Sequence, residues 1–550
     1  MTKKIFTSSV LFLAFFTFLE AQSTGLKVYQ VFQEKCATCH DNASPQSGLD
    51  LEGAGATEAA RYADVYNNIV DATPANTYAA GETYDYIYKG RPDKSFLFRK
   101  VSQGLEQSIN MHQDEEGTMP PSNQTQLTDV EKEMIRQWIL YGAPQSGEVV
   151  DQDLIELYYS GQGIASFDTP PPAPDPSEGF QIKMGPFYLQ PQGQPGAELE
   201  YFQKYELELP EDVDVDRIDM KIATSSHHFI IYNFQFPWAA STVPHGLRLN
   251  PDHTSISLVT AVQESTDLQL PETTAFKWQN DMILDLNSHY INYSATMAYQ
   301  AEAYFNVYTK PAGTAEHEMK TELIVNGNIP IDNDANTVTY SQVYTDNSAG
   351  EVFVWGLMGH THKYGRDYKA YKRENGQQGE LIYDASCSEG IPGCVSPYFD
   401  YQHIPIRYFE PLMPLDLSGN NGFVHTASWL NDGPVPVNFG PTSADEMMVM
   451  VLMYTDEQIG DATFNNEITN LSVLDVYPNP MNEKALLHLP ENGSQFSFRL
   501  YDVLGQEVRR QDGLTGAEFL LERNGLGNGM YVYVVVDEEG TRYTGKLMMD

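Results

Sequence analysis

Five consecutive residues near the N-terminus, Cys36-Ala37-Thr38-Cys39-His40, have types and spacing that suit one specific chemistry. Two thiols held one turn apart can add to the two vinyl groups of a haem, and the histidine that follows can point its imidazole at the iron. A zinc site and a disulfide are the alternative interpretations of the two cysteines. The sequence predicts one covalently bound haem c on Cys36 and Cys39, with His40 as axial ligand.

A methionine on a stiff loop is a natural second axial ligand. The stretch Gly117-Thr118-Met119-Pro120-Pro121 lies between two expected helices, and thioether ligation opposite a histidine raises the reduction potential of a haem. Most methionines are core residues, so the loop setting is what distinguishes Met119. Met119 is the predicted second ligand, and Met111 and His112 are its rivals.

The elements around these residues are expected to be helical. Val28, Val31 and Phe32 form an apolar stripe that leads into the cysteines. A second helix is expected to begin at Thr128, where Glu131 completes a capping box, and to end at Gly142. With Ser47-Gly48-Leu49-Asp50-Leu51 after the haem motif, residues 25–148 resemble a small class I cytochrome c. That resemblance implies an all-α domain.

A second set of candidate ligands lies in the strand-rich middle of the chain. His227-His228, His289, His360-Thr361-His362 and then Asp445-Glu446-Met447 follow one another in that order. Residues i and i+2 of a strand share a face, so His360 and His362 can hold one ion between them. Imidazole suits zinc, copper, iron and nickel, so the residue type alone does not choose the metal. For a lone His-x-His, a hydrogen-bonded surface pair is the plainer interpretation.

The ordered set, with Gly440-Pro441-Thr442 before the methionine, resembles the copper type II, ascorbate-dependent monooxygenases. This family includes the peptidylglycine alpha-hydroxylating and dopamine beta-monooxygenases. The resemblance covers residues 179–460 and implies two antiparallel, jelly-roll-like β-sandwich domains, 179–312 and 313–460, with one copper ion each. It assigns the electron-storing copper to His227, His228 and His289, and the oxygen-activating copper to His360, His362 and Met447.

Two points qualify these ligand sets. Met448 and Met450 are neighbouring rivals, but only Met447 belongs to the Asp-Glu-Met string, and a thioether favours Cu(I). Adjacent His227 and His228 face opposite ways on a regular strand, so joint ligation needs a bulge or a strand end.

The sequence departs from the peptide-amidating members at two positions. Met358 stands where those members carry a carboxylate-binding arginine, and Val451 stands where they carry a tyrosine. A glycine-extended peptide is therefore not the expected substrate, and an uncharged or apolar one is. Cys387 and Cys394 are expected to form a disulfide in the second domain, with a metal thiolate pair as the alternative.

The last block carries a different signature. Val476-Tyr477-Pro478-Asn479-Pro480, Leu500-Tyr501-Asp502-Val503-Leu504-Gly505 and Gly529-Met530-Tyr531 occur in order over residues 471–550. The set resembles the C-terminal sorting domain of type IX secretion substrates, a small Ig-like β-sandwich. It implies export across the outer membrane of a Gram-negative cell, followed by release or surface attachment. An ordinary Ig-like adhesion module is the alternative.

The bulk composition agrees with an exported multidomain protein. The 550 residues suggest about three or four domains. A formal net charge of −42 disfavours nucleic acid as a partner. Residues 1–21 are expected to be a signal peptide, and no other stretch is apolar enough to anchor the mature chain in a membrane. The Pro-rich stretch within residues 160–178 is expected to be an extended linker.

Together these patterns predict a mainly β, multidomain, secreted or surface-attached protein with one haem c and two copper ions. The expected activity is a copper-dependent monooxygenase that hydroxylates a C–H bond of a small organic substrate with O2. Electrons would come from the fused haem, from ascorbate, or from a redox protein that feeds the haem. The alternative is a non-catalytic haem and copper electron-transfer protein on the cell surface, and a third, weaker interpretation is an adhesin.

Overall fold

The computed structural model divides the chain into two compact units, residues 1–462 and 463–550. It describes residues 22–106, 109–223, 225–262, 265–385, 399, 401, 404, 406–440, 444–459, 474, 476–489, 495–501, 507–537 and 542–549. The expected signal peptide and the expected Cys387–Cys394 disulfide lie outside the described residues. No helix among the described residues is long and apolar enough to span a membrane.

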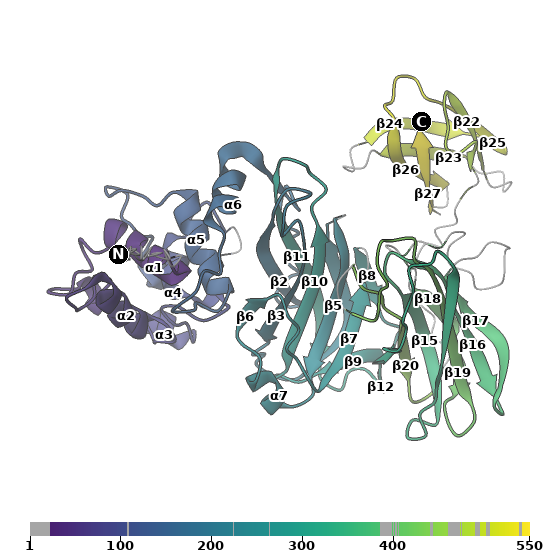
Figure 1. Ribbon diagram of the computed structural model, residues 1–550, viewed down its shortest axis with the longest axis horizontal. Coiled ribbons are helices and arrows are strands. Elements are labelled where there is room, and N and C mark those ends of the chain that lie inside the picture. The colour runs from purple at the N-terminus through teal and green to yellow at the C-terminus, as the bar shows by residue number, and fades with distance from the viewer. Residues whose placement is uncertain are drawn as a thin grey trace, which may run out of the picture. The chain divides into compact units, whose positions relative to one another are not determined.

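Unit 1 begins with a helical block, residues 22–162 (Figure 1). The capping box predicted for the helix that begins after Thr128 is present. The Thr128 hydroxyl accepts from the Glu131 N–H, and the Glu131 carboxylate accepts from the Thr128 N–H. That helix ends at Leu140, before Gly142 with its positive φ of 80°. The helices are α1 (Thr24–Lys35), α2 (Glu58–Ile69), α3 (Thr77–Gly81), α4 (Phe96–Val101), α5 (Asp129–Leu140) and α6 (Gln152–Leu157), followed by a π-helical turn (Tyr158–Gln162).

The first β-body, residues 163–318, consists of a seven-stranded and a five-stranded sheet. The larger has the order β1-β11-β4-β9-β12, with β2 also on β11 and β8 also on β4, and the smaller has the order β6-β3-β10-β5-β7. The elements are β1 (Gly163–Ala165), β2 (Gly179–Leu189), β3 (Glu198–Glu206), β4 (Val213–Ile222), β5 (Ser226–Phe234), α7 (Pro237–Ser241), β6 (Gly246–Arg248), β7 (Ile256–Val262), β8 (Thr266–Gln269), β9 (Thr274–Trp278), β10 (Ile283–Ile291), β11 (Ala298–Pro311) and β12 (His317–Glu318).

Pairing in this body is antiparallel except for the short strands β1 and β12, which pair in parallel with β11 and β9. On β11, Ala301, Ala303, Phe305 and Val307 share one face and are fully buried. The residues between them, Glu302, Tyr304 and Asn306, are at most 9% exposed, so both faces of the strand are covered.

The second β-body, residues 319–459, has two four-stranded antiparallel sheets with the orders β13-β20-β15-β18 and β14-β19-β16-β17. Its core includes Tyr368, Trp429 and Leu452. The strands are β13 (Lys320–Val325), β14 (Thr337–Tyr344), β15 (Glu351–His360), β16 (Gly365–Glu374), β17 (Gln377–Asp384), β18 (Arg407–Asp416), β19 (Gly422–Leu430) and β20 (Val449–Thr455).

Unit 2 is a small sandwich with sheet orders β21-β22-β25 and β24-β23-β26-β27. Phe498, Leu500 and Val535, from neighbouring strands, are fully buried in its core. The strands are β21 (Val476–Tyr477), β22 (Lys484–His488), β23 (Phe496–Tyr501), β24 (Glu507–Leu514), β25 (Glu518–Glu522), β26 (Gly529–Asp537) and β27 (Arg542–Met549). With the two β-bodies of unit 1, this makes the described chain mainly β, as predicted.

The segment expected to be an extended linker lies along β11. Its first residues form β1, Gln181 Nε2 donates to the Pro171 carbonyl at 3.0 Å, and Asn306 Nδ2 donates to the Pro172 carbonyl at 3.0 Å. A proline-rich stretch cannot pair its carbonyls within a helix. Here two of these carbonyls accept hydrogen bonds from side chains of the first β-body instead.

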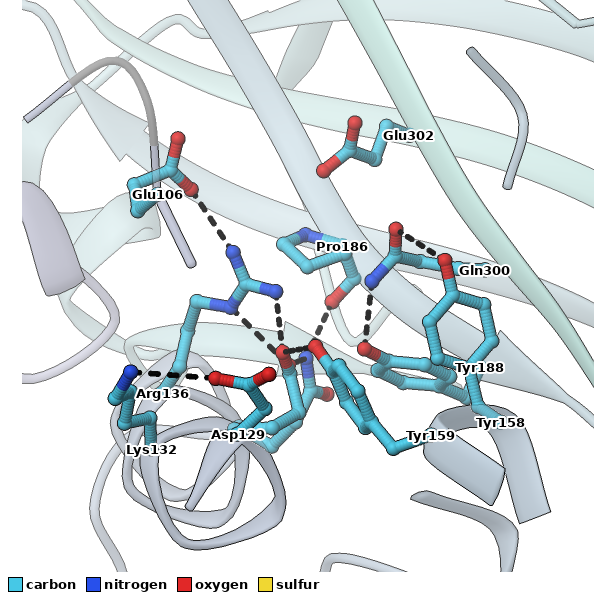
Figure 2. Close-up of polar contacts among 12 residues, drawn as sticks. Glu106, Asp129, Lys132, Arg136, Tyr158, Tyr159, Pro186, Tyr188, Gln300 and Glu302 are labelled. Carbon is cyan, nitrogen blue, oxygen red and sulfur yellow. Dashed lines mark hydrogen bonds and ion pairs between the residues drawn. The ribbon is translucent and has the colours of Figure 1, made fainter. Parts of the chain in front are cut away.

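A buried polar network joins α5 to the first β-body (Figure 2). Arg136 pairs with Glu133 on its own helix and with Glu106, and Lys183 of β2 contacts the same Glu106 carboxylate at 2.9 Å. The Tyr159 hydroxyl donates to Glu133 at 3.0 Å. Charges buried this deeply need mutual pairing, so the network fixes how helix and sheet meet.

Candidate functional site

A cavity of about 460 Å³ opens in the helical block and is lined by the four predicted haem residues Cys36, Cys39, His40 and Met119. Apolar side chains, among them Leu97 and Val101, complete its wall. Its volume lies in the range of small-molecule and cofactor sites. The structure therefore brings both predicted axial ligands and both predicted attachment thiols to one cavity.

His40 is oriented by the backbone. Its Nδ1 lies 3.0 Å from the Leu49 carbonyl oxygen. A carbonyl can only accept, so Nδ1 carries the proton and Nε2 presents a lone pair. Burial raises the pKa of the Cys36 thiol to about 12, which suits a thiol that ends in a thioether rather than a thiolate.

The two rivals of Met119 do not line the cavity. His112 instead caps a short helical turn through Asp114 N and stacks on Tyr78, with ring centroids 4.3 Å apart. Met119 is held through its backbone N–H, which donates to the Lys100 carbonyl at 2.8 Å.

Four of the predicted copper-binding histidines meet where the two β-bodies of unit 1 face each other. His289 of β10 is the cross-strand partner of His228 of β5, and their ring centroids lie 5.4 Å apart. The His228 ring lies 5.9 Å from that of His360, which lies 5.2 Å from that of His362. All four side chains are buried. Residues up to 134 positions apart thus form one cluster, called here the histidine cluster.

A β-bulge falls at His227. His289 pairs with His228, but Tyr290 pairs with Ser226, so the ladder skips His227. This is the irregularity that joint ligation by His227 and His228 requires. The side chain of His227 lies outside the described part of the structure, so its ligation remains a prediction.

His360 and His362 are not related as two residues of one regular strand. β15 ends at His360, and His362 lies in the loop that follows. The His362 N–H donates to Glu446 Oε2 at 2.9 Å, and its Nδ1 lies 3.1 Å from the Asp445 carbonyl. The His362 ring is therefore positioned by the segment that contains Asp445 and Glu446 rather than by the alternation of a strand. Because Nδ1 donates to the carbonyl, Nε2 carries the lone pair.

Glu446 holds the loop that carries His362. Besides the His362 N–H, this fully buried carboxylate accepts from Tyr364 N at 2.7 Å and from Trp429 Nε1 at 2.8 Å. Burial raises the pKa of Glu446 to about 7, and these donors oppose the rise. The Asp-Glu-Met string that the sequence singled out therefore supports the loop through its backbone and its carboxylate.

Two carboxylates of β3 contact the other pair of histidines. His228 Nε2 lies 3.2 Å from Glu200 Oε1 and 3.1 Å from Asn287 Oδ1, and His289 Nε2 lies 3.0 Å from Glu198 Oε1. Carboxylates only accept, so Nε2 is the protonated nitrogen of both rings and Nδ1 carries the lone pair.

The pKa values of the second pair favour neutral imidazoles. Burial, followed by the other histidines of the cluster, lowers the pKa of His360 well below its usual value. Burial and His228 lower the pKa of His362 to about 4. Neutral imidazole is the form that binds metal ions.

These residues fit the donor set of a metal site. Metal-binding histidines characteristically donate their second ring N–H to a carboxylate or a carbonyl, as His228, His289 and His362 do. Among the described residues, no group of three or more His, Cys, Asp or Glu side chains is arranged to hold a metal ion. That finding covers neither the sulfur of Met447 nor the side chain of His227. Met447 is half-buried and directly follows Glu446.

Sequence reasoning did not identify Glu198, Glu200 and Asn287. The alternation Glu198-Leu199-Glu200 does place two carboxylates on one face of an expected strand, which was the available signal. Their position beside histidines of β5 and β10 depends on strand order, which one sequence does not reveal.

Comparison with known proteins shows the nature of the tail. Residues 475–550 match the family of secretion system C-terminal sorting domains. The chain therefore ends in a type IX sorting domain, and the protein is secreted or attached to the cell surface. The secretion machinery is accordingly a partner of this tail.

No curated protein matches the sequence. Solved structures with partial similarity to this chain include the following two. A β-D-glucuronidase from Dictyoglomus thermophilum is 11% identical over 44% of this chain and 44% of its own length, with a TM-score of 0.16. PNGF-II is 10% identical over 52% of this chain and 66% of its own, with a TM-score of 0.25. These TM-scores are too low to indicate a shared fold or activity.

Proposed function

We propose that this protein is a secreted copper-dependent monooxygenase that hydroxylates a C–H bond of an organic substrate and carries its own haem electron donor. The observation that carries the proposal is the histidine cluster. His228 and His289 come from one β-body and His360 and His362 from the other, yet they meet at ring distances of 5.2–5.9 Å. Imidazoles gathered from such distant positions are typical of metal sites, and burial lowers the pKa of two of them, His360 and His362.

The proposed ligands follow from the ring orientations. His228 and His289, together with His227, would hold one copper ion, with Nδ1 as the donor atom of the first two. His360, His362 and Met447 would hold the second. Bound copper would supply the one-electron steps and the activation of dioxygen. The overall reaction consumes O2, two electrons, two protons and one C–H bond, and yields an alcohol and water.

The chain itself would do three things for this chemistry. It keeps His360 and His362 unprotonated through burial, fixes the His362 ring through the Asp445 carbonyl, and holds the loop through Glu446. Burial of the cluster also keeps bulk water away from the reacting atoms.

An apolar substrate is favoured by two residues next to the second site. Met358 lies two residues before His360 on the same strand face, and its cross-strand partner is Val451. Both side chains are buried, each only 3% exposed. Neither of these two side chains carries a positive charge that could bind a carboxylate group of the substrate.

The helical block would supply electrons through its haem. It is attached to the first β-body by contacts such as Gln137 Nε2 to the Pro186 carbonyl at 2.7 Å and the Tyr88 hydroxyl to Glu206 at 3.1 Å. A haem passes one electron at a time, and each copper stores one, so the two kinds of centre match. Ascorbate could replace or supplement this supply.

One observation favours the non-catalytic alternative, an electron-transfer protein with haem and copper. All four histidines of the cluster are at most 9% exposed, so an organic substrate needs the two β-bodies to part before it can reach the site. An electron carrier has no such requirement.

Metal stoichiometry and oxygen chemistry distinguish these functions. The haem is reduced anaerobically, an O2 pulse is added, and haem reoxidation is followed optically. The enzyme predicts two copper ions per haem and reoxidation that is lost when His360 and His362 are replaced by alanine. His488→Ala, at a half-exposed histidine of unit 2, is the control and should behave as wild type. One copper or none, with reoxidation unaffected by His360 and His362, would support the electron carrier.

A further inference from the structure

Strand β3 places two carboxylates directly beside the predicted first copper site. Glu200 of β3, His289 of β10 and His228 of β5 are cross-strand partners in one row, across three adjacent strands. Cross-strand partners project from the same face of a sheet, and neighbouring strands lie about 4.8 Å apart. Glu198 is two residues from Glu200 and shares that face. The row is thus built into the register of the sheet.

Each carboxylate contacts a different imidazole. Glu200 Oε1 accepts from His228 Nε2 at 3.2 Å and from Asn287 Nδ2 at 3.0 Å, and Glu198 Oε1 accepts from His289 Nε2 at 3.0 Å. The Glu200 side chain is 12% exposed and that of Glu198 is 38% exposed. Both imidazoles therefore direct Nε2–H at an anion and Nδ1 away from it. The second pair of histidines differs, because His362 is oriented by a neutral carbonyl.

We propose that Glu198 and Glu200 are positioning residues of the first copper site, which select Nδ1 of His289 and His228 as the ligand atoms and set the charge of the site. This inference rests on the proposed function. An imidazole that donates to a carboxylate is a more basic ligand than one that donates to a carbonyl. Two nearby negative charges also stabilise a doubly charged cation more than a singly charged one.

The consequence is a difference between the two copper sites. The site flanked by Glu198 and Glu200 favours Cu(II), whereas a site with a thioether ligand and a carbonyl-oriented imidazole favours Cu(I). An electron placed on the first site is therefore less strongly retained than one on the second. The two carboxylates would therefore favour electron transfer from the first copper site to the second.

The test compares Glu200→Gln and Glu198→Gln with Glu206→Gln. Glutamine keeps an oxygen acceptor of the same length but removes the charge. Glu206 lies on the same strand and contacts Tyr88 and His245, neither of which belongs to the histidine cluster, so its substitution controls for charge removal away from that cluster. Affinities for Cu(II) and Cu(I) are measured by competition titration, the midpoint potential by anaerobic redox titration, and the folded state by circular dichroism.

We expect Glu200→Gln to weaken Cu(II) binding about 10- to 100-fold, the usual range for an outer partner of a ligating histidine. Cu(I) binding should change much less, and each tenfold difference then raises the midpoint potential by about 59 mV. Glu198→Gln should act in the same direction but less strongly, because its carboxylate is more exposed.

The inference would be overturned if the wild-type protein binds copper but Glu198→Gln and Glu200→Gln match Glu206→Gln in both copper affinity and midpoint potential. The proposed function would still stand in that case. Wild-type protein that binds no copper would instead end the proposed function, and this inference with it.

Discussion

His40 and His362 are oriented in the same way although they lie in different folds. Each places its Nδ1 against a main-chain carbonyl, that of Leu49 at 3.0 Å and that of Asp445 at 3.1 Å. Each Nε2 then carries the lone pair, whichever tautomer the free imidazole would prefer. Ligand geometry at both sites thus depends on backbone that lies 9 and 83 residues away in the sequence.

Replacing Met119 by alanine tests whether it is the second axial ligand of the proposed haem. The thioether that raises the reduction potential is lost, so the potential should fall and the optical spectrum should show that the iron has lost a strong ligand. Optical redox titration measures both effects. Met111→Ala, at a methionine that does not line the cavity, should leave spectrum and potential unchanged, and an equal effect of both variants would contradict the assignment.

At the residue scale, the sequence singled out side chains whose type and setting imply chemistry. Cys36, His40 and Met119 line one cavity, and the rings of His360 and His362 lie 5.2 Å apart, although a loop rather than one strand face brings these two together. It could not predict Glu200, because a glutamate on a strand face is usually solvated and becomes a partner of His228 only through the order of β3, β10 and β5.

Strand β19 carries a buried histidine that makes the second β-body sensitive to acid. The Tyr368 hydroxyl donates to His425 Nδ1 at 2.6 Å, and His425 Nε2 donates to Gln342 Oε1 at 2.9 Å. Burial lowers the pKa of His425 to about 4. Because the unfolded chain binds this proton at a pKa of about 6.5 and the folded chain does not, stability is present above pH 6.5 and is lost as the pH falls towards 4.

The corresponding prediction concerns His425→Gln. Glutamine can accept from Tyr368 and donate to Gln342, but it does not titrate. Between pH 7 and pH 5, wild type should lose about 2 kcal/mol more than the variant. Urea unfolding at the two pH values, followed by tryptophan fluorescence, measures the difference. Parallel losses in both proteins would show that His425 does not cause the acid sensitivity.

Helix α5 offers a matched pair of substitutions for the network of Figure 2. Arg136→Met leaves Glu133 and Glu106 without the cation between them, so unit 1 should lose about 3–5 kcal/mol of stability. Lys132→Met removes an ion pair with Asp129, whose side chain is 58% exposed, and should cost less than about 1 kcal/mol. Denaturant titration measures both values. Similar losses for the two variants would show that the buried network does not hold helix and sheet together.

Regular elements were predictable where one periodic pattern dominates, as in α5 with its capping box and in β11, where Ala301, Ala303, Phe305 and Val307 share one buried face. Irregular features were not. The end of β15 at His360 and the bulge at His227 depend on hydrogen bonds to Glu446 and on pairing with β10. The sequence predicted a free-standing linker because the residues that bind it, Gln181 and Asn306, lie on strands β2 and β11, and one sequence does not show that these strands lie beside it.

Removing the tail should separate export from folding. Residues 463–550 form their own compact unit, and 475–550 match the sorting family. A chain that ends at residue 462 should therefore fold, bind its cofactors and stay inside the cell envelope. Cell fractionation and the absorbance of the haem measure these outcomes. Export of the truncated chain, or its failure to fold, would contradict this division of roles.

The histidine cluster draws its donors from both β-bodies, and this has a consequence for the survival of the protein outside the cell. In the proposed arrangement each copper ion is held by ligands of one β-body and would stabilise that body by mass action, by about 2.7 kcal/mol when free metal exceeds its dissociation constant a hundredfold. Chelators that strip both ions would destabilise the two faces that meet at the histidine cluster and expose them to extracellular proteases. The lifetime of the secreted protein would then report how much metal its surroundings contain.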